Sequence, residues 1–308
     1  MNYYIHYQGG AGGDFLRVCL WLLLNPKLKI SWDSPSDWEN EFGAKGKAYT
    51  CTHEVNGKKY GYSFFSLMDN GSVKPIGSFS HIGRGEIVKG RYFRSIIPEL
   101  SFYLSTRDNK NYSDIFEYFN NLEMKNTEDS LPDTGNSVWN SHLIYHAGIG
   151  AVQDVMKYLK EKCNHIVDLH IGIMPKDPID SIIIRYVDGL KNEIPTNWNR
   201  VNTMIAENND DAVGVLLQNF YQHKVMYDYI LGNDGFLIDF RNLMLSGPYD
   251  LAKQLSKKID NIQISQSYLD FFKMYNNVNN WEDIFNGKEV TNLREFFEER
   301  AGELKTWQ

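Results

Sequence analysis

The sequence predicts a three-layer α/β/α protein in which helices cover both faces of a mainly parallel sheet. The first observation is that strand-like and helix-like segments alternate along most of the 308 residues, as they do in parallel sheets. The second is the start of the chain, where a strand-like run breaks into glycines and resumes as an apolar helix-like segment. The third is the composition, 42% hydrophobic and 23% charged, which is typical of a globular protein.

Residues 3–7 (YYIHY) are aromatic and β-branched and are predicted to form the first strand. Residues 14–24 are predicted to be a helix that ends at Asn25-Pro26, because the residue before a proline avoids helical geometry. Between the two lie Gly9, Gly10, Ala11, Gly12 and Gly13, followed by Asp14. Glycines let several backbone N–H groups approach an anion, and the start of a helix adds partial positive charge. We therefore interpret residues 9–14 as a phosphate-binding loop, with a tight turn that holds no ligand as the alternative.

The middle of the chain contains several shorter elements. Residues 31–46 are rich in Ser, Asp, Glu and Gly and are expected to form an exposed connection. Strands are predicted at 48–53 and 60–65, joined by a hairpin turn at Asn56-Gly57. Further strands are expected at 75–82 and 100–105, helices at 113–122 and 150–163, and a loop at 123–138.

The second half returns to strand–helix alternation. A strand is predicted within 165–173, a helix over 210–231, a strand over 235–240 and a helix from Pro248 to about Lys258. Residues 182–184 (III) fit either a strand or a buried helix. The tail from Trp281 is predicted to be helical, with its acidic residues on a solvated face. We expect one domain over 1–308, with a β-hairpin insertion around 48–75 and a helical portion at 265–308.

Composition also narrows the class of protein. A net charge of −7 argues against a broad nucleic-acid surface. No apolar run approaches 18 residues, so no membrane span is expected, and no secretory signal is expected at the N-terminus. The three cysteines are far apart, which disfavours disulfides and a zinc cluster and favours the cytoplasm. The glycine-, tyrosine- and asparagine-rich style suggests a viral or marine microbial source.

Polar residues directly after predicted strands are the candidates for chemistry, because open parallel sheets bind ligands at the carboxyl ends of their strands. Arg107 follows the 100–105 strand and suits an anion, and Ser113 six residues later could bind the same anion. The alternatives are an ion pair for Arg107 and a helix cap for Ser113. His81 is the candidate general base and His53 its rival, with a structural role as the alternative for each.

The order of these features resembles the P-loop sulfotransferases. In that family a strand leads into a phosphosulfate loop of the type PKSGTTWL, and residues 9–16 (GGAGGDFL) stand in that place. Ser80-His81 is similar to the family's Thr-His pair, and Arg107 with Ser113 to its later Arg and Ser. Residues 236–243 with Pro248 are similar to its YEDLL-dP element. Lys176-Asp177-Pro178-Ile179-Asp180 is similar to its R-dP-xD turn, which makes Lys176 a rival location for the 3′-phosphate.

The resemblance implies a donor, 3′-phosphoadenosine-5′-phosphosulfate, and a small-molecule or glycan acceptor, with no metal. It implies that the 9–14 loop holds the phosphosulfate, that Arg107 and Ser113 hold the 3′-phosphate, and that His81 deprotonates the acceptor. The family's loop lysine is replaced by Gly10, and Gly13 and Asp14 replace its threonines. A kinase-like nucleotide-dependent transferase and a non-catalytic protein on the same scaffold are the other two hypotheses.

Overall fold

The computed structural model describes parts of the first 184 residues and all of residues 211–301. The described residues are 1–8, 10–27, 29–32, 34, 36–39, 45–48, 50–55, 58–63, 137–141, 148–150, parts of 152–160, 166–176, 179–184 and 211–301. The predicted strands at 75–82 and 100–105, the predicted helix at 113–122 and the side chains of His81, Arg107 and Ser113 lie outside these ranges.

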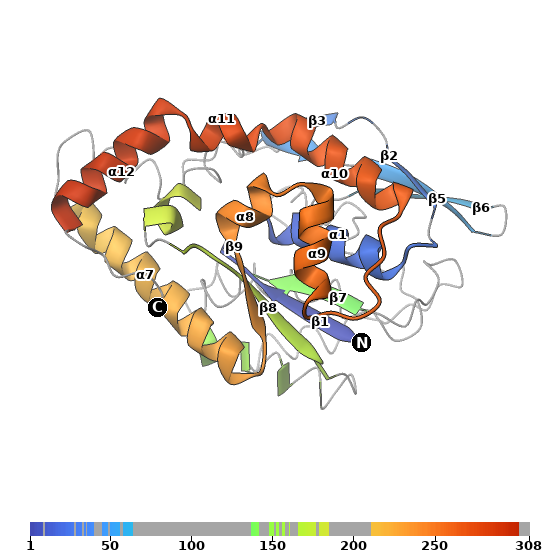
Figure 1. Cartoon of the computed structure of the whole chain (residues 1–308), viewed down its shortest axis with the longest axis horizontal. Helices are drawn as coiled ribbons and strands as arrows, with labels where there is room; N and C mark the ends of the chain where they lie inside the picture. The colour runs from blue at the N-terminus through green and yellow to red at the C-terminus, as the bar shows by residue number, and fades with distance from the viewer. Residues whose placement is uncertain are drawn as a thin grey trace.

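A four-stranded parallel sheet lies at the centre of the described fold (Figure 1). Its order is β7 (Ser137–Ser141), β1 (Asn2–His6), β8 (Leu169–Met174) and β9 (Phe236–Asp239). All three neighbouring pairs are parallel; Tyr4 lies opposite both Trp139 and His170. The predicted α/β class is confirmed, as are the strands expected near the first residues, within 165–173 and within 235–240.

Strand β7 was not predicted, because residues 123–138 read as a polar loop. All five of its residues pair with β1, and Val138 is buried. Only Val138 and Trp139 carry strand propensity in this stretch, so the strand depends on pairing with a segment 135 positions away in sequence (Asn2 with Ser137).

One face of β1 packs on helix α1 (Gly13–Leu24), which follows it directly. The described side chains of α1 are buried, and the helix packs between the sheet and α10 (Gln266–Asn279). Phe15 stacks on Tyr275 of α10 with ring centroids 4.2 Å apart. Asn25 ends the helix, as the sequence predicted: its backbone N–H donates to Leu22 and its Nδ2 to the carbonyl of Trp21.

The other face of β1 meets helix α7 (Asp211–Gly232), which packs on β8 and β9 and was predicted over 210–231. Met226 and Ile230 of α7 are fully buried. Residues 179–184 are helical, which decides the ambiguity at Ile182–Ile184 in favour of a buried helix. None of the helices in the described ranges is long and apolar enough to cross a membrane.

After β9, the described chain to residue 301 forms helices joined by short connections. It comprises α8 (Phe240–Leu245), α9 (Pro248–Ser256), α10, α11 (Trp281–Phe285) and α12 (Lys288–Ala301). Asp239 caps α8 by accepting the backbone N–H of Asn242 at 2.8 Å. Figure 1 shows α10, α11 and α12 following one another along one side of the molecule, and α12 contacts α7.

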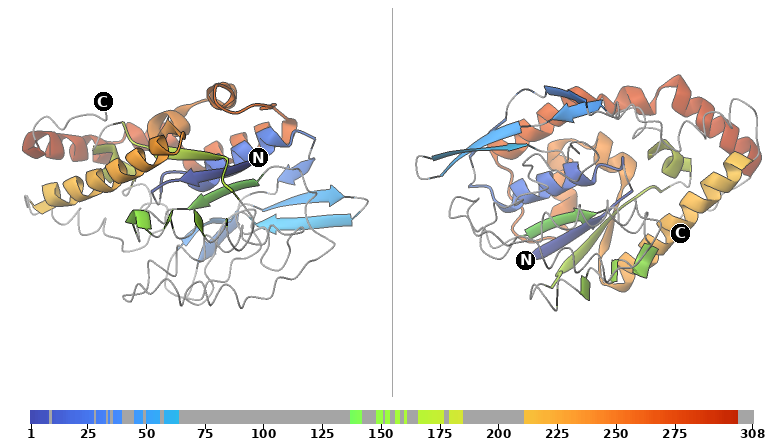
Figure 2. Two further views of the ribbon diagram at one scale, coloured as in Figure 1. Left: turned by 90° about the horizontal axis from the view of Figure 1, so that it is seen from below. Right: turned by 180° about the vertical axis from the view of Figure 1, so that it is seen from behind.

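Short antiparallel strands replace the exposed connection expected at 31–46. They are β2 (Ile30–Trp32), β3 (Ser36–Glu39) and β4 (Lys45–Ala48). The interpretation as a loop was wrong because it relied on polarity, whereas the β3–β4 ladder uses backbone groups that polar residues and glycine also supply. Strands β5 (Thr50–Val55) and β6 (Lys58–Ser63) pair antiparallel, as the Asn56-Gly57 signal predicted, and project from the body in Figure 2.

The three-stranded sheet β2–β5–β6 is attached to α10 through β2. The backbone N–H of Ile30 donates to Ser267 Oγ at 3.0 Å, and Trp32 Nε1 donates to the carbonyl of Ser267 at 3.1 Å. The Trp32 ring also lies 4.9 Å from that of Phe271. These contacts connect the antiparallel sheet to the core that surrounds α1.

Candidate functional site

The carboxyl ends of β1, β8 and β9 share one edge of the sheet, because the three strands are parallel. Within the sheet, the next described strand of this sheet after β1 in the sequence, β7, lies on one side of β1. The later strands β8 and β9 lie on the other side. The strand order therefore changes direction at β1, and its carboxyl end is where open α/β sheets place their ligands. The segment that follows β1 at this point is the glycine loop, residues 9–13.

The described part of the glycine loop is a tight turn into α1. Gly10 and Gly12 have φ of 87° and 78°, the left-handed region that glycine adopts without strain. The backbone N–H of Ala11 donates to the carbonyl of Gln8 at 2.9 Å, and that of Leu16 donates to Gly12. Gly9 lies outside the described residues, and Asp14 is described only as a backbone position in the first turn of α1.

Packing accounts for two of the glycines. A side chain on Gly12 would collide with the Met244 side chain of α8, and one on Gly13 would collide with the ring of Tyr7. The sequence interpretation took the excess of glycine as a sign of a ligand. At Gly13, the close approach of the Tyr7 ring is a sufficient reason for glycine. At Gly12, the left-handed backbone is the main reason, because the end of the flexible Met244 side chain can move.

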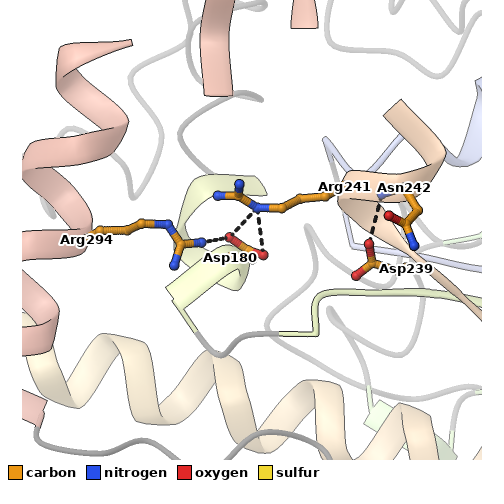
Figure 3. Close-up of polar contacts among 5 residues, drawn as sticks. All are labelled: Asp180, Asp239, Arg241, Asn242 and Arg294. Carbon is orange, nitrogen blue, oxygen red and sulfur yellow. Dashed lines mark hydrogen bonds and ion pairs between the residues drawn. The ribbon is translucent and has the colours of Figure 1, made fainter. Parts of the chain in front are cut away.

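A charged cluster lies beyond the ends of β8 and β9 (Figure 3). Asp180, from the 179–184 helix, is buried, and its carboxylate accepts from Arg241 of α8 and Arg294 of α12. Arg241 Nε lies 3.0 Å from both carboxylate oxygens. Figure 3 shows the two guanidinium groups reaching Asp180 from opposite sides. Two arginines share one carboxylate, so these three groups carry a formal net charge of +1.

Arg241 has hydrogen-bonding capacity left over. Its Cζ lies 4.9 Å from the ring centroid of Phe285, and its Nη2 is buried without a hydrogen-bond partner in the described part of the chain. The same short helix carries Met244, which covers Gly12. Helix α8 thus connects the glycine loop with the charged cluster.

A buried polar layer lies between β1 and α7. Because side chains alternate along a strand, Tyr4 and His6 share the face opposite α1. Gln8, two residues past the strand, contacts His223 of α7. His6 Nε2 and His170 Nδ1 of β8 are 2.9 Å apart, and the ring of Tyr229 from α7 packs edge-on against both.

The two histidines of this layer are neutral at pH 7. Burial lowers the pKa of His6 well below its usual range, and the adjacent His170 lowers it further. Burial also lowers the pKa of His170 to about 4. One ring therefore donates and the other accepts in their hydrogen bond.

The structure brings together only part of the predicted site. Gly10, Ala11, Gly12 and Gly13 lie at the carboxyl edge of β1, and Lys176 lies exposed just after β8. Gly9, His81, Arg107 and Ser113 are outside the described residues. His53 lies inside β5, paired with Ile30 and Tyr60, in the antiparallel sheet rather than after a strand of the parallel one.

Sequence reasoning missed two features of this edge. The Asp180–Arg241–Arg294 cluster joins segments that the sequence analysis treated separately, the turn at Lys176–Asp180 and the 236–243 segment. Arg294 stands in a helix that reads as an acidic solvated face, and its neighbours Glu295, Glu298 and Glu299 are indeed exposed. The buried Gln8 directly before the glycines was not considered, although its position was a usable signal.

The described residues hold no group of three His, Cys, Asp or Glu side chains that could bind a metal ion. Comparison of the chain with protein-family models, with curated proteins and with solved structures finds no match.

Proposed function

We propose that this protein is a sulfotransferase-like enzyme. It would bind 3′-phosphoadenosine-5′-phosphosulfate at the glycine loop and transfer the sulfuryl group to a hydroxyl or amine of a small-molecule or glycan acceptor. The observation that carries the proposal is the position of the loop. A glycine-rich connection leads directly from a parallel strand into a helix, at the strand where the sheet order changes direction. The same arrangement supports the finer assignment to a three-layer P-loop fold.

Each predicted residue has a role in this reaction. The backbone N–H groups of residues 10–14 hold the phosphosulfate, and Arg107 with Ser113 binds the 3′-phosphate, with Lys176 as the rival location. His81, or His53 as its rival, takes the proton of the acceptor as its oxygen or nitrogen bonds to sulfur. The bond from sulfur to the phosphate oxygen breaks, and adenosine 3′,5′-bisphosphate leaves. Catalysis rests on positioning and charge stabilisation.

The family's loop lysine is absent, and Arg241 is the described cation best suited to replace it. It lies at the carboxyl edge on the helix that covers Gly12, and it has a buried N–H group free for an anion. A guanidinium group holds its charge at every physiological pH, so it can stabilise the leaving phosphate without proton transfer.

Transfer of sulfur-35 from the labelled donor to a panel of hydroxyl and amine acceptors tests the activity. We expect labelled product with the unmodified protein, loss of product with His81→Ala, and retention with His53→Ala. Retention with His81→Ala and loss with His53→Ala would reverse the assignment of the base. Absence of labelled product from every acceptor would contradict the proposed activity.

A second candidate function is a non-catalytic binding or structural protein on the same scaffold. The observation that favours it is the packing of Met244 and Tyr7 at the positions where Gly12 and Gly13 lack side chains. In that case the glycines serve the core, and the missing lysine has no consequence. Binding of the nucleotide without any turnover, or no binding at all, would favour this candidate.

A further inference from the structure

We propose that Gln8 is an additional ligand-binding residue, whose side-chain Nε2 donates to an oxygen of the phosphate or sulfuryl group held at the glycine loop. The inference rests on the proposed function, because it assigns a role within the same site. Gln8 is a neutral hydrogen-bond donor directly before a loop that lacks the family's lysine.

The backbone of Gln8 is part of the loop. Gln8 is the second residue after β1 and precedes Gly9, and its carbonyl accepts the backbone N–H of Ala11 at 2.9 Å. This hydrogen bond closes the turn that contains Gly10. Gln8 therefore stands at the carboxyl edge of β1, where the strand order changes direction.

The side chain of Gln8 is buried and held from one end. Only 1% of the residue is exposed, and its Oε1 lies 2.7 Å from Nε2 of His223, a fully buried residue of α7. The imidazole N–H donates to Oε1, and this directs the oxygen toward α7. The amide nitrogen is left at the other end of a carboxamide whose orientation is fixed.

That nitrogen has no acceptor. Gln8 Nε2 is buried, and no group in the described ranges accepts a hydrogen bond from it. Most buried amide groups in proteins are hydrogen-bonded, because an unpaired buried donor destabilises the fold. A buried donor on the residue that opens a glycine loop is the arrangement expected where a ligand oxygen completes the hydrogen bond.

The chemistry of the donor defines its partner. With Oε1 already engaged by His223, Gln8 offers only N–H groups, so the partner must supply an acceptor oxygen. The terminal oxygens of a phosphate or a sulfuryl group are such acceptors, and a hydrogen bond to a charged acceptor is stronger than a neutral one.

The experiment measures the affinity for adenosine 3′,5′-bisphosphate by calorimetric titration. Gln8→Met removes the donor at nearly constant length, and Gln8→Glu keeps an acceptor oxygen for His223 while replacing the donor with a carboxylate. Gln222→Met is the matched control: Gln222 is the neighbour of His223 on α7, and its unpaired buried atom is the acceptor Oε1, which an anion cannot use. Thermal melting of each free variant reports whether it is folded.

We expect about a tenfold or greater loss of affinity in Gln8→Met, a larger loss in Gln8→Glu, and the affinity of the unmodified protein in Gln222→Met. If the unmodified protein binds and the folded Gln8 variants bind equally well, this inference is overturned and the proposed function stands. If both Gln8 variants fail to fold, Gln8 is structural and the inference is overturned. If the unmodified protein does not bind, the proposed function fails first, and the inference falls with it.

Discussion

The Arg241 guanidinium and the Asp180 carboxylate meet side by side, with Nε 3.0 Å from both carboxylate oxygens, although the residues are 61 positions apart. Arg294, 114 positions from Asp180, binds the same carboxylate from α12. One buried carboxylate thus holds three helices together beyond the ends of β8 and β9: the 179–184 helix, α8 and α12.

Loss of this carboxylate is expected to destabilise the fold. Asp180→Asn leaves two arginines without their common anion, and removing one partner of a buried ion pair is costly. Because the Arg241 and Arg294 side chains are 31% and 25% exposed, solvent screens part of the effect. We expect the free energy of unfolding to fall by about 2–3 kcal/mol in urea denaturation.

The exposed pair of Lys224 and Asp228 on α7 gives a matched control. Its side chains are 53% and 59% exposed, so Lys224→Met should change the free energy of unfolding by less than about 0.5 kcal/mol. An effect of Asp180→Asn no larger than that of the control would show that the cluster contributes little to stability.

Gly12 is expected to be intolerant of a side chain for two separable reasons. Gly12→Ala introduces strain at a φ of 78° and a collision with Met244. We expect it to lower the free energy of unfolding by about 2–3 kcal/mol, measured by chemical denaturation. In a Met244→Ala background only the backbone strain remains, about 1–2 kcal/mol.

The double-mutant cycle therefore separates packing from backbone conformation. An equal cost of Gly12→Ala in both backgrounds would mean that Met244 does not explain the glycine. Packing against α8 would then not account for the glycine, and a ligand at Gly12 would be the better explanation.

The His6–His170 pair makes stability depend on pH. Above pH 6.5 both rings are neutral whether the chain is folded or unfolded, so the pair adds no pH dependence. As pH falls below 6.5, the unfolded chain binds protons that the folded state, with a His170 pKa of about 4, does not. Stability should therefore fall from pH 6.5 to about 4, and His6, whose pKa is also lowered, adds to the loss.

The contribution of His170 to this loss is about 3 kcal/mol, the free-energy equivalent of its pKa shift. His170→Gln keeps a polar side chain but does not titrate. The difference in free energy of unfolding between the two proteins should change across pH 6.5–4 and be constant above it. Parallel curves over the whole range would contradict the assignment of the pair as neutral.

The sequence pattern predicted the elements whose residues lie close together in the sequence. The strand at 3–7, the glycine turn and the helix over 14–24 could be predicted, because the apolar spacing, the glycines and the proline that mark them lie within about two dozen residues. The Asn56-Gly57 signal found the β5–β6 pairing for the same reason. Strand β7 could not be found, because its five residues become a strand only through pairing with β1.

The candidate site was predictable in outline only. The glycine loop and Lys176 could be placed at strand ends by counting, but the burial of Gln8 and its bond to His223 depend on where α7 crosses the sheet. The contact of Arg294 with Asp180 likewise depends on the path of α12, which no local pattern encodes. For His53 the strand was predicted but its place was not, because that strand belongs to the antiparallel sheet and not to the parallel one.

The location of the 3′-phosphate can be tested by substitution. We expect Arg107→Ala to weaken binding of adenosine 3′,5′-bisphosphate by about 1.5–3 kcal/mol, the scale of a charge-assisted hydrogen bond. Lys176→Ala and the exposed control Lys253→Ala should leave the affinity unchanged. The reverse result, with loss only in Lys176→Ala, would move the 3′-phosphate to the turn after β8.

The central claim is that the glycine loop binds the nucleotide of a sulfotransferase. Calorimetric titration of the purified protein with adenosine 3′,5′-bisphosphate tests it most directly, with ATP and magnesium titrated in parallel. We predict a dissociation constant on the order of micromolar for the bisphosphate, with no requirement for metal. Binding of ATP with magnesium alone would contradict the claim and favour a kinase-like transferase, and binding of neither would show that the loop serves only the packing of α1 and α8.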